Sequence, residues 1–390
     1  MKVARIVTAS EAVEFHLRNT LDQFQGEYDL EVIGDNVSQY RERWPLVKFT
    51  DLKIVRKIHL WRDSVALIGL TAIFIHRRYD IVHSIMPKAG LISALAGFVT
   101  FTPVRMHTFT GQIWKNNKGP KRWIFKMIDR VIVALSTKCM TDSRSQSQFL
   151  FDEGIGQSNA PLEHFGQGSL SGVNLDRFNA QRLMSERKRI RNEVRADEDT
   201  RVFIFLGRKC KDKGTLDLLL AFRQAFGTSE KARLVLVGPE DDEDFKKLFY
   251  SEFEGQKNVF NYMSTTTPES FLAAGDVFCL PSYREGFGSV VIEAAALSLP
   301  TIGSDITGLK DAIVENETGL LIEPGDVQNL ASCLKRALEN PSLFKQMGEK
   351  AQERAAEKFA MKRLYELLSR EYESLLNKKI FNPDQKLSQK

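Results

Sequence analysis

Short apolar or β-branched runs alternate with longer amphipathic stretches along the whole chain. The short runs predict β-strands, and the amphipathic stretches, such as Leu216–Phe226 and Val327–Glu339, predict helices. The strands predicted in the first half are Val3–Thr8, Leu30–Ile33, Ile81–Ser84, Arg105–Phe109 and Cys139–Thr141. Those predicted in the second half are Val202–Leu206, Arg233–Val237, Val259–Phe260, Val277–Leu280, Thr301–Gly303 and Gly319–Ile322. This alternation favours parallel sheets with right-handed crossovers, so we predict an α/β fold of two Rossmann-like domains facing each other across a cleft.

A change in composition predicts the domain boundary. A chain of 390 residues has room for two domains at roughly 150 residues each. The segment Gln181–Arg195 is highly charged and precedes a fresh strand at Val202. We therefore expect a first domain over residues 1–180 and a second over 181–360. Ala351–Leu376 is one long helical pattern that we expect to bend around Phe359–Ala360, with a C-terminal helix and mobile tail over residues 361–390.

Composition and cysteine spacing exclude several classes of protein. Apolar residues make up 43% and charged residues 27%, which are ordinary globular values and exclude disorder or coiled coil as the main architecture. The four cysteines are far apart, so we expect buried thiols in a reducing cytosol rather than disulfides or a zinc site. The uncharged run Ala89–Val104 is shorter than the roughly 20 residues of a membrane span and is predicted as a buried helix running into a strand. No secretory signal is expected, because Glu11 and Glu14 interrupt the N-terminal segment.

Two familiar nucleotide sites are also excluded. The first strand is followed by Thr8–Ala12, and Leu206 is followed by a basic segment, so neither series opens with G-x-G-x-x-G. The spacing of a P-loop is missing as well. A dinucleotide-dependent dehydrogenase is therefore not expected.

A basic loop follows the strand Val202–Leu206. The segment Gly207–Gly214, called the basic loop below, carries four cations between two glycines, just before a predicted helix. Open α/β sheets place their ligands at this carboxyl end of a strand. The cluster suits a diphosphate whose charge must be neutralised as a leaving group departs. A solvated charged loop is the alternative interpretation.

A second segment, Pro281–Ala296, follows the strand Val277–Leu280 and carries two carboxylates, Glu285 on a Gly-rich turn and Glu293 inside a predicted helix. The helix, predicted from about Val290, would present free N–H groups to an anion. Glu285 is expected to accept hydrogen bonds from sugar hydroxyls and Glu293 from a ribose diol. Alternatively Glu293 is structural. Paired acids also suggest a glycosidase, but an acid inside a helix suits binding better than proton transfer.

These segments resemble the E-x7-E motif and associated motifs of the glycosyltransferase group 1 family (family 4), which has the GT-B fold. The resemblance covers most of the chain. The further matching segments are Gly172–Phe178, Leu206–Gly214, Val235–Gly238, Gly308–Leu309 and Glu315–Leu321. The GT-B fold implies that the C-terminal helix returns to the first domain.

The resemblance implies a retaining glycosyltransferase that transfers a hexosyl or N-acetylhexosaminyl group from a nucleotide sugar, expected to be UDP-linked. By similarity, the residues that hold the donor diphosphate are Arg208, Lys213, Gly288, Ser289 and Val290. Those that contact the donor sugar or ribose are Glu285, Gly286, Phe287 and Glu293. No cofactor or metal is implied, and we interpret the D-x-D sequence at Asp242–Asp244 as a coincidence.

The first domain is expected to bind the acceptor. His107 ends a predicted strand, and the family often has a histidine here, close to the transferred sugar, so Glu285 and His107 are the catalytic candidates. A satisfied interior histidine is the alternative interpretation of His107. The other acceptor-side candidates are His16, Lys88, Gly111 and Gln112. The segments around Lys88 and His107 resemble bacterial enzymes of capsule, exopolysaccharide or O-antigen synthesis, which extend saccharides on polyprenyl diphosphate.

The net charge of +5 is unevenly distributed. Between Arg41 and Arg130, 17 Lys and Arg stand against five Asp and Glu, a balance of +12, so the rest of the chain sums to −7. All four tryptophans (Trp44, Trp61, Trp114 and Trp123) fall in this window. Basic and aromatic residues together favour peripheral contact with anionic lipid, so we expect a cytoplasmic protein on the inner face of the cell membrane. Solvated helix faces are the alternative, and no nucleic-acid-binding motif is present.

Two other functions remain open from the sequence. A UDP-sugar epimerase or a phosphorylase of the GT-B fold would keep the architecture and change the reaction. A non-catalytic lipid- or polyanion-binding protein would use the basic window alone, and it would leave Arg208, Lys213, Glu285 and Glu293 without a role.

Overall fold

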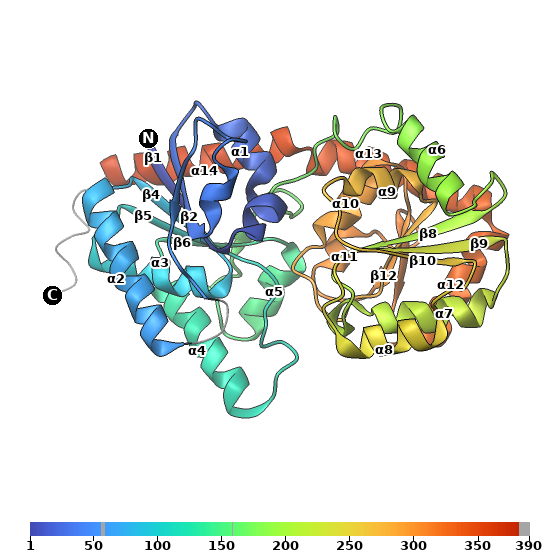
Figure 1. Ribbon diagram of the computed structural model, residues 1–390. Coiled ribbons are helices and arrows are strands. Elements are labelled where there is room, and N and C mark those ends of the chain that lie inside the picture. The colour runs from blue at the N-terminus through green and yellow to red at the C-terminus, as the bar shows by residue number, and fades with distance from the viewer. Residues whose placement is uncertain (56–58, 158, 382–390) are drawn as a thin grey trace. The chain divides into compact units, whose positions relative to one another are not determined.

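The computed structural model describes residues 1–55, 59–157 and 159–381 (Figure 1). Contacts separate two compact units, one formed by Met1–Ser171 with the stretch from Met361, the other by Gly172–Ala360. Each unit is built on a parallel sheet with crossover helices, which confirms the α/β fold class with two Rossmann-like domains. The strands are buried along almost their whole length because helices cover the sheet, as parallel sheets require.

The sheet of the first unit has the strand order β3-β2-β1-β4-β5-β6-β7. Its strands are β1 (Lys2–Ala9), β2 (Asp29–Asp35), β3 (Lys48–Asp51), β4 (Ile81–Ile85), β5 (Val104–Phe109), β6 (Lys138–Thr141) and β7 (Glu163–His164). Its α-helices are α1 (Arg18–Phe24), α2 (Leu60–Arg77), α3 (Pro87–Val99), α4 (Gly119–Leu135), α5 (Arg144–Asp152) and α14 (Met361–Phe381). Val13–Leu17 forms a π-helical turn and Val37–Tyr40 a 3₁₀ turn. The order reverses between β1 and β4, the position where such sheets bind ligands.

The sheet of the second unit has the strand order β10-β9-β8-β11-β12-β13. Its strands are β8 (Arg201–Leu206), β9 (Ala232–Val237), β10 (Val259–Tyr262), β11 (Val277–Leu280), β12 (Thr301–Ser304) and β13 (Gly319–Ile322). Its α-helices are α6 (Met184–Glu193), α7 (Thr215–Phe226), α8 (Glu243–Glu252), α9 (Pro268–Ala274), α10 (Ser289–Ala296), α11 (Leu309–Ala312), α12 (Val327–Glu339) and α13 (Pro341–Phe359). Lys211–Lys213 forms a 3₁₀ turn. Here the order reverses between β8 and β11.

The boundary between the units lies earlier than the sequence predicts. The chain passes from one unit to the other at Ser171–Gly172, not after residue 180. The charged segment that suggested a linker forms helix α6, and Ile190 in this helix and Val194 directly after it are buried in the core of the second unit. Its charge density is therefore that of a helix with one solvated face.

The long C-terminal helical pattern is broken where the sequence predicts a bend. Helix α13 ends at Phe359, Ala360 is extended (φ −53°, ψ 134°), and α14 begins at Met361. Helix α14 belongs to the first unit, where the ring of Tyr372 stacks 5.9 Å from Phe24 and its hydroxyl lies 2.6 Å from His83 Nδ1. The expected return of this helix to the first domain is confirmed. The predicted tail beyond residue 381 lies outside the described residues.

The uncharged run Ala89–Val104 forms most of α3 and the first residue of β5, as predicted. Across the parts of the chain that the structure describes, no helix combines the length and apolar character needed to cross a bilayer.

Candidate functional site

The basic loop and the Glu285 turn lie at the carboxyl ends of two neighbouring strands. The basic loop follows β8, and the segment Pro281–Gly288, called the glutamate turn below, follows β11, which pairs with β8. Gly214 ends the basic loop with φ +65°, and a Cβ there would lie 2.0 Å from the carbonyl oxygen of Pro281. Only glycine lets the two segments approach so closely.

Lys213 and Glu285 form the centre of this site. Lys213 Nζ donates to Glu285 Oε1 at 2.5 Å, and Ser282 Oγ donates to the same oxygen at 2.8 Å. The side chains are 21% and 12% exposed, so the pair is largely shielded yet reachable from solvent. The structure therefore brings together two of the predicted donor residues and adds Ser282, which the sequence motif did not single out.

The four cations of the basic loop have different surroundings. Arg208 Nη1 lies 2.6 Å from Asp241 Oδ2, and both side chains are about half exposed. Lys209 is fully buried, with Nζ donating to Tyr262 O at 2.9 Å and to Asn261. Burial lowers the pKa of Lys209 to about 8. Lys209 thus ties the loop to the end of β10 and has a structural role, unlike Arg208 and Lys213, which the sequence assigns to the diphosphate.

The glutamate turn leads directly into helix α10. The helix begins at Ser289, one residue before the predicted start, and Gly288 precedes it with φ +83°. The first N–H groups of a helix have no partner within it, so Ser289 and Val290 lie where an anion would be bound. Glu293 lies in the second turn of the same helix. Gly286 lies in the turn, four residues ahead of Val290.

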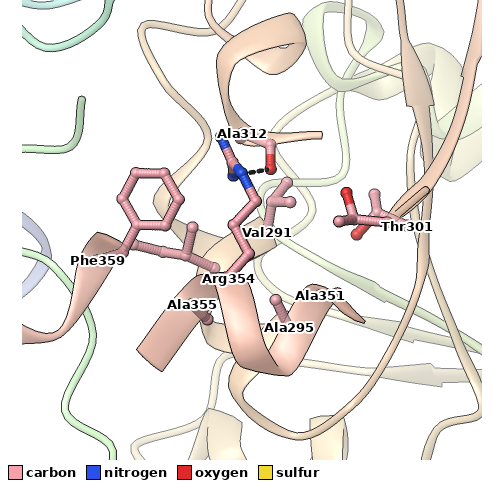
Figure 2. Close-up of a pocket in the computed structure, with 10 residues that line it drawn as sticks. Val291, Ala295, Thr301, Ala312, Ala351, Arg354, Ala355 and Phe359 are labelled. Carbon is pink, nitrogen blue, oxygen red and sulfur yellow. Dashed lines mark hydrogen bonds between the residues drawn. The ribbon is translucent and has the colours of Figure 1, made fainter. Parts of the chain in front are cut away.

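Phe287 anchors the glutamate turn to the interior of the unit. It is 2% exposed, and its ring centroid lies 5.2 Å from that of Phe359 at the end of α13. The guanidinium of Arg354 lies 4.7 Å from the Phe359 ring and donates to Ala312 O at 3.0 Å (Figure 2). Arg354 and Phe359 line a cavity of about 10 Å³, space for one water molecule. Phe287 therefore positions the turn by packing, in addition to its predicted place near the donor.

The D-x-D segment has a structural role. Asp242 caps α8, accepting from Asp244 N at 2.8 Å through Oδ1, and accepts from Lys211 N at 2.9 Å through Oδ2. Among the described residues, no cluster of His, Cys, Asp or Glu has the arrangement of a metal site. Asp242 instead joins α8 to the basic loop.

His107, the catalytic candidate of the first unit, is buried on strand β5. Only 1% of its surface is exposed, and its Nδ1 lies 2.9 Å from Ser84 Oγ. Burial lowers the pKa of His107 to about 3, so the imidazole is neutral near pH 7 and suits hydrogen bonding rather than proton uptake. A Cβ on Gly90 would lie 2.4 Å from its Cε1, so α3 packs directly on the ring.

The buried Nε2 atom of His107 and both amide atoms of Gln112 have no hydrogen-bond partner among the described residues. Gln112, 1% exposed, and Gly111 follow β5 in the loop that begins beyond Phe109. Unpaired buried polar atoms are costly unless a ligand or water satisfies them. Of the acceptor-side candidates, His107 and Gln112 therefore have atoms that can still form hydrogen bonds with a ligand.

The remaining acceptor-side candidates occupy the same edge of the sheet. Lys88, in the first turn of α3 after β4, pairs with Asp63 Oδ1 at 2.9 Å. His16 lies in the π-helical turn after β1. His83 of β4 lies 2.8 Å from Thr108 Oγ1 and is also in contact with Tyr372, so its role is structural. Since β1, β4 and β5 are neighbours, their carboxyl ends bring this set to one edge.

The loop that carries Gln112 is fixed through a buried tryptophan. Trp114 is 1% exposed, and its Nε1 donates to Asp129 Oδ2 at 2.6 Å. Arg122 and Lys126 lie over its ring at 5.0 and 5.6 Å, and both pair with Glu153. The role of this carboxylate could not be predicted from the sequence, because Asp129 falls within a basic helix.

We expect Asp129→Asn to stabilise the protein increasingly as pH rises. Burial raises the pKa of Asp129 from 3.8 to about 7, so the folded state holds a proton between these values that the unfolded chain releases. The contribution of protonated Asp129 to the free energy of unfolding is therefore fully present below pH 3.8 and is lost as pH rises towards 7. Asparagine keeps an acceptor for Trp114 and never ionises. Denaturant unfolding should show the variant gaining about 2 kcal/mol over wild type between pH 5 and pH 8. The exposed Asp152→Asn is the control, and a pH-independent difference for Asp129→Asn would contradict this assignment.

Similar proteins and solved structures indicate the class of enzyme. Residues 186–354 match the family described as glycosyl transferases group 1, a segment that includes the basic loop and the glutamate turn. A Staphylococcus aureus capsular polysaccharide biosynthesis glycosyltransferase, CapM, is 27% identical over 380 residues, covering 96% of this chain and 97% of the relative. An Escherichia coli UDP-Gal:α-D-GlcNAc-diphosphoundecaprenol α-1,3-galactosyltransferase is 25% identical over 323 residues, covering 78% of this chain and 80% of the relative.

Among solved structures, Anabaena HepE in complex with UDP and glucose superimposes with a TM-score of 0.78 at 16% identity, covering 96% of this chain and all of HepE. WaaG, a glycosyltransferase of lipopolysaccharide biosynthesis, superimposes with a TM-score of 0.71 at 16% identity, covering 96% of this chain and 99% of WaaG. These structures confirm the GT-B fold. The match over residues 186–354 and the relative that spans nearly the whole chain show that the protein is a glycosyltransferase.

Proposed function

We propose that the protein transfers a hexosyl or N-acetylhexosaminyl group, with retention of configuration, from a UDP-sugar to a saccharide carried on polyprenyl diphosphate. The observation that carries the proposal is the Lys213–Glu285 pair beside the first turn of α10, with Arg208 on the same loop. A relative named for capsular polysaccharide synthesis, one named for a diphosphoundecaprenol acceptor, and HepE bound to UDP support the assignment to surface polysaccharide assembly.

In the proposed reaction the bond between the anomeric carbon and the diphosphate oxygen breaks while an acceptor hydroxyl forms a new bond on the same face. The diphosphate oxygen takes the proton of the acceptor, so no protein nucleophile is needed. Lys213, Arg208 and the amides of α10 stabilise the charge that develops on the leaving diphosphate, without a metal. Glu285 accepts hydrogen bonds from sugar hydroxyls, and Glu293 from the ribose.

On the acceptor side, His107 and Gln112 supply hydrogen bonds. Both are buried and carry polar atoms without a partner among the described residues, so a saccharide hydroxyl would satisfy them. Neutral His107 orients a hydroxyl without taking up its proton.

Titration calorimetry with UDP, GDP and ADP tests the donor assignment. We expect UDP to bind at least tenfold more tightly than GDP or ADP. Equal affinity for the three nucleotides, or tighter binding of GDP, would overturn the UDP assignment while leaving the glycosyltransferase class intact.

Contact with the membrane is proposed through one face of the first unit, formed by α2, the turn after α3, and α4. Helix α3 packs between α2 and α4, so the three helices are neighbours (Figure 1). The large apolar side chains exposed there are Leu60, Trp61, Val65, Ile68, Ile75, Phe98, Val99, Phe101, Trp123 and Ile124. The structure corrects the expected composition of this surface, since Trp44 and Trp114 are buried in the core. Arg56 and Lys57 of the basic window lie outside the described residues.

The same segments carry exposed cations, among them Arg62 of α2, Arg78 directly after α2, and Lys121 of α4. Apolar side chains that enter the lipid headgroup region, combined with cations that attract anionic lipids, are the two components of peripheral membrane binding. An anionic bilayer is therefore the proposed partner, and it would hold the enzyme near a lipid-linked acceptor.

The combined variant Trp61→Ser, Ile68→Ser and Trp123→Ser should lose binding to vesicles that contain anionic lipid. Their side chains are 74%, 69% and 63% exposed, so the fold does not depend on them. Vesicle sedimentation should show at least a tenfold weaker partition, with unchanged affinity for UDP. Tyr250→Ser with Met263→Ser, exposed apolar residues of the second unit, is the control. Retained vesicle binding by the combined variant would show that this face is not the membrane contact.

A further inference from the structure

A cavity of about 460 Å³ lies in the second unit, at the opposite edge of the sheet from the glutamate turn. Arg201 begins β8, Asp276 directly precedes β11, and Leu299 precedes β12, so the cavity is at the amino ends of the strands. It is lined by Ala180, Arg187, Arg201, Ala273, Gly275, Asp276, Leu297, Ser298, Leu299, Pro341, Ser342, Phe344 and Lys345. Its volume is in the range of small-molecule sites, roughly 300–1,000 Å³.

The charged groups around this cavity leave a surplus of positive charge. Asp276 is shared, with one oxygen 3.0 Å from Arg187 and the other 3.0 Å from Arg191. Lys345 is 79% exposed, and its Nζ lies 4.0 Å from Glu349 Oε1, at the outer limit of an ion pair. The lining therefore has more cations (Arg187, Arg201 and Lys345) than carboxylates (Asp276).

Arg201 is the least satisfied of these cations. Across the described residues its guanidinium has no ion pair, and its Nε atom is buried without a hydrogen-bond partner. A buried guanidinium nitrogen without an acceptor is costly, and an anion in the cavity would remove that cost. The first turn of α13 begins at Pro341 in the same wall and adds the positive end of a 19-residue helix.

We propose that this cavity binds a small phosphate monoester, either a sugar phosphate or a nucleoside monophosphate, as a regulator of the donor site. Arg201 and Lys345 pair with the phosphate, and Leu297, Leu299 and Phe344 form an apolar wall for the rest of the molecule. Neither the family motif nor the reaction uses these residues. The regulatory part rests on the proposed use of a nucleotide-sugar donor.

Two helices connect the cavity with the glutamate turn. Helix α10 starts at Ser289, beside the turn, and is followed by Leu297 and Ser298 in the cavity wall. Helix α13 starts in the cavity wall and ends at Phe359, which packs on Phe287 of the turn. Gln352 of α13 donates to Ala296 O of α10 at 3.0 Å, so a displacement of one helix is transmitted to the other. A ligand that shifts either helix would change donor affinity by this route.

The test is titration calorimetry of the full-length protein with glucose 6-phosphate, UMP and inorganic phosphate. We expect one of the two esters to bind wild type, Arg201→Gln to weaken it at least tenfold, and Lys213→Ala to leave it unchanged. Lys345→Gln should weaken binding several-fold, and the exposed Lys335→Gln of α12 should not. Because Lys345 is surface-exposed, its variant keeps the test valid if Arg201→Gln fails to fold. Glucose 6-phosphate and UMP distinguish the two classes of ester.

The proposal is overturned if neither ester binds, if binding is insensitive to Arg201→Gln and Lys345→Gln, or if Lys213→Ala abolishes it, which would place the ester in the donor site. The regulatory part requires that a saturating ester changes the Kd for UDP at least threefold in wild type and not in Arg201→Gln. An unchanged Kd for UDP with the ester bound would refute regulation. Failure of UDP itself to bind wild type would contradict the proposed function, and so the two failures are distinguishable.

Discussion

Replacing Lys213 with alanine should lower kcat/KM for sugar transfer by about 100- to 1,000-fold. The Lys213 ammonium is partly shielded and lies 2.5 Å from Glu285, on a loop held against the glutamate turn. Removing it takes away a cation from the leaving diphosphate and leaves Glu285 as an uncompensated carboxylate that repels the donor. Steady-state release of nucleotide measures the loss, and circular dichroism establishes that the variant is folded.

Lys211→Ala is the matched control for this prediction. Lys211 belongs to the same 3₁₀ turn and carries the same charge, but its side chain is exposed, and its contact with Asp242 is made by its backbone N–H. Its kcat/KM for sugar transfer should fall by less than about fivefold, the scale of a screened surface charge. Equal losses for the two lysines would mean that the loop acts through its total charge, and that Lys213 has no specific place in the site.

Glu285→Gln should lower kcat by roughly 100-fold with a smaller change in KM, because the effect is on groups that act in the transition state. The amide keeps the size of the side chain and an oxygen that can accept from Ser282, but it loses the negative charge that pairs with Lys213. The expected result is a fully folded protein that binds UDP nearly as wild type does and turns over slowly. Initial-rate kinetics measure kcat and KM, and calorimetry measures the affinity for UDP.

Two further variants sharpen that test. Ser282→Ala removes one of the hydrogen bonds to Glu285 and should cause an intermediate loss of about tenfold, near the roughly 1 kcal/mol of one such bond. Glu323→Gln removes an exposed carboxylate of the same unit and should have no effect. Wild-type turnover by folded Glu285→Gln would refute the role proposed for Glu285.

The positions of Lys213 and Glu285 could be predicted from sequence because both follow strands in a parallel sheet, and such ends share one edge. Their pairing could not, since the two residues are 72 positions apart and the register between their loops depends on packing. The same limit explains Lys209, whose burial at the end of β10 is set by Asn261 and Tyr262 rather than by its neighbours in the basic loop.

The errors of the sequence interpretation have physical causes as well. Trp44 and Trp114 share a basic window with exposed tryptophans, but each is buried with its Nε1 donating to a carboxylate, Asp22 and Asp129. Strand β3 (Lys48–Asp51) and strand β7 (Glu163–His164) were missed because they are short edge strands with few apolar residues. Edge strands are partly solvated, so their sequences lack the continuous apolar run of the central strands.

The most direct test of the account is release of nucleotide from a panel of UDP-, GDP- and ADP-sugars, with and without a saccharide on polyprenyl diphosphate. We expect rapid release of UDP only when the lipid-linked acceptor is present, together with an α-linked product from an α-linked donor. Release of GDP or ADP in place of UDP, an inverted product, or conversion of the UDP-sugar without any acceptor, as an epimerase would perform, would contradict it.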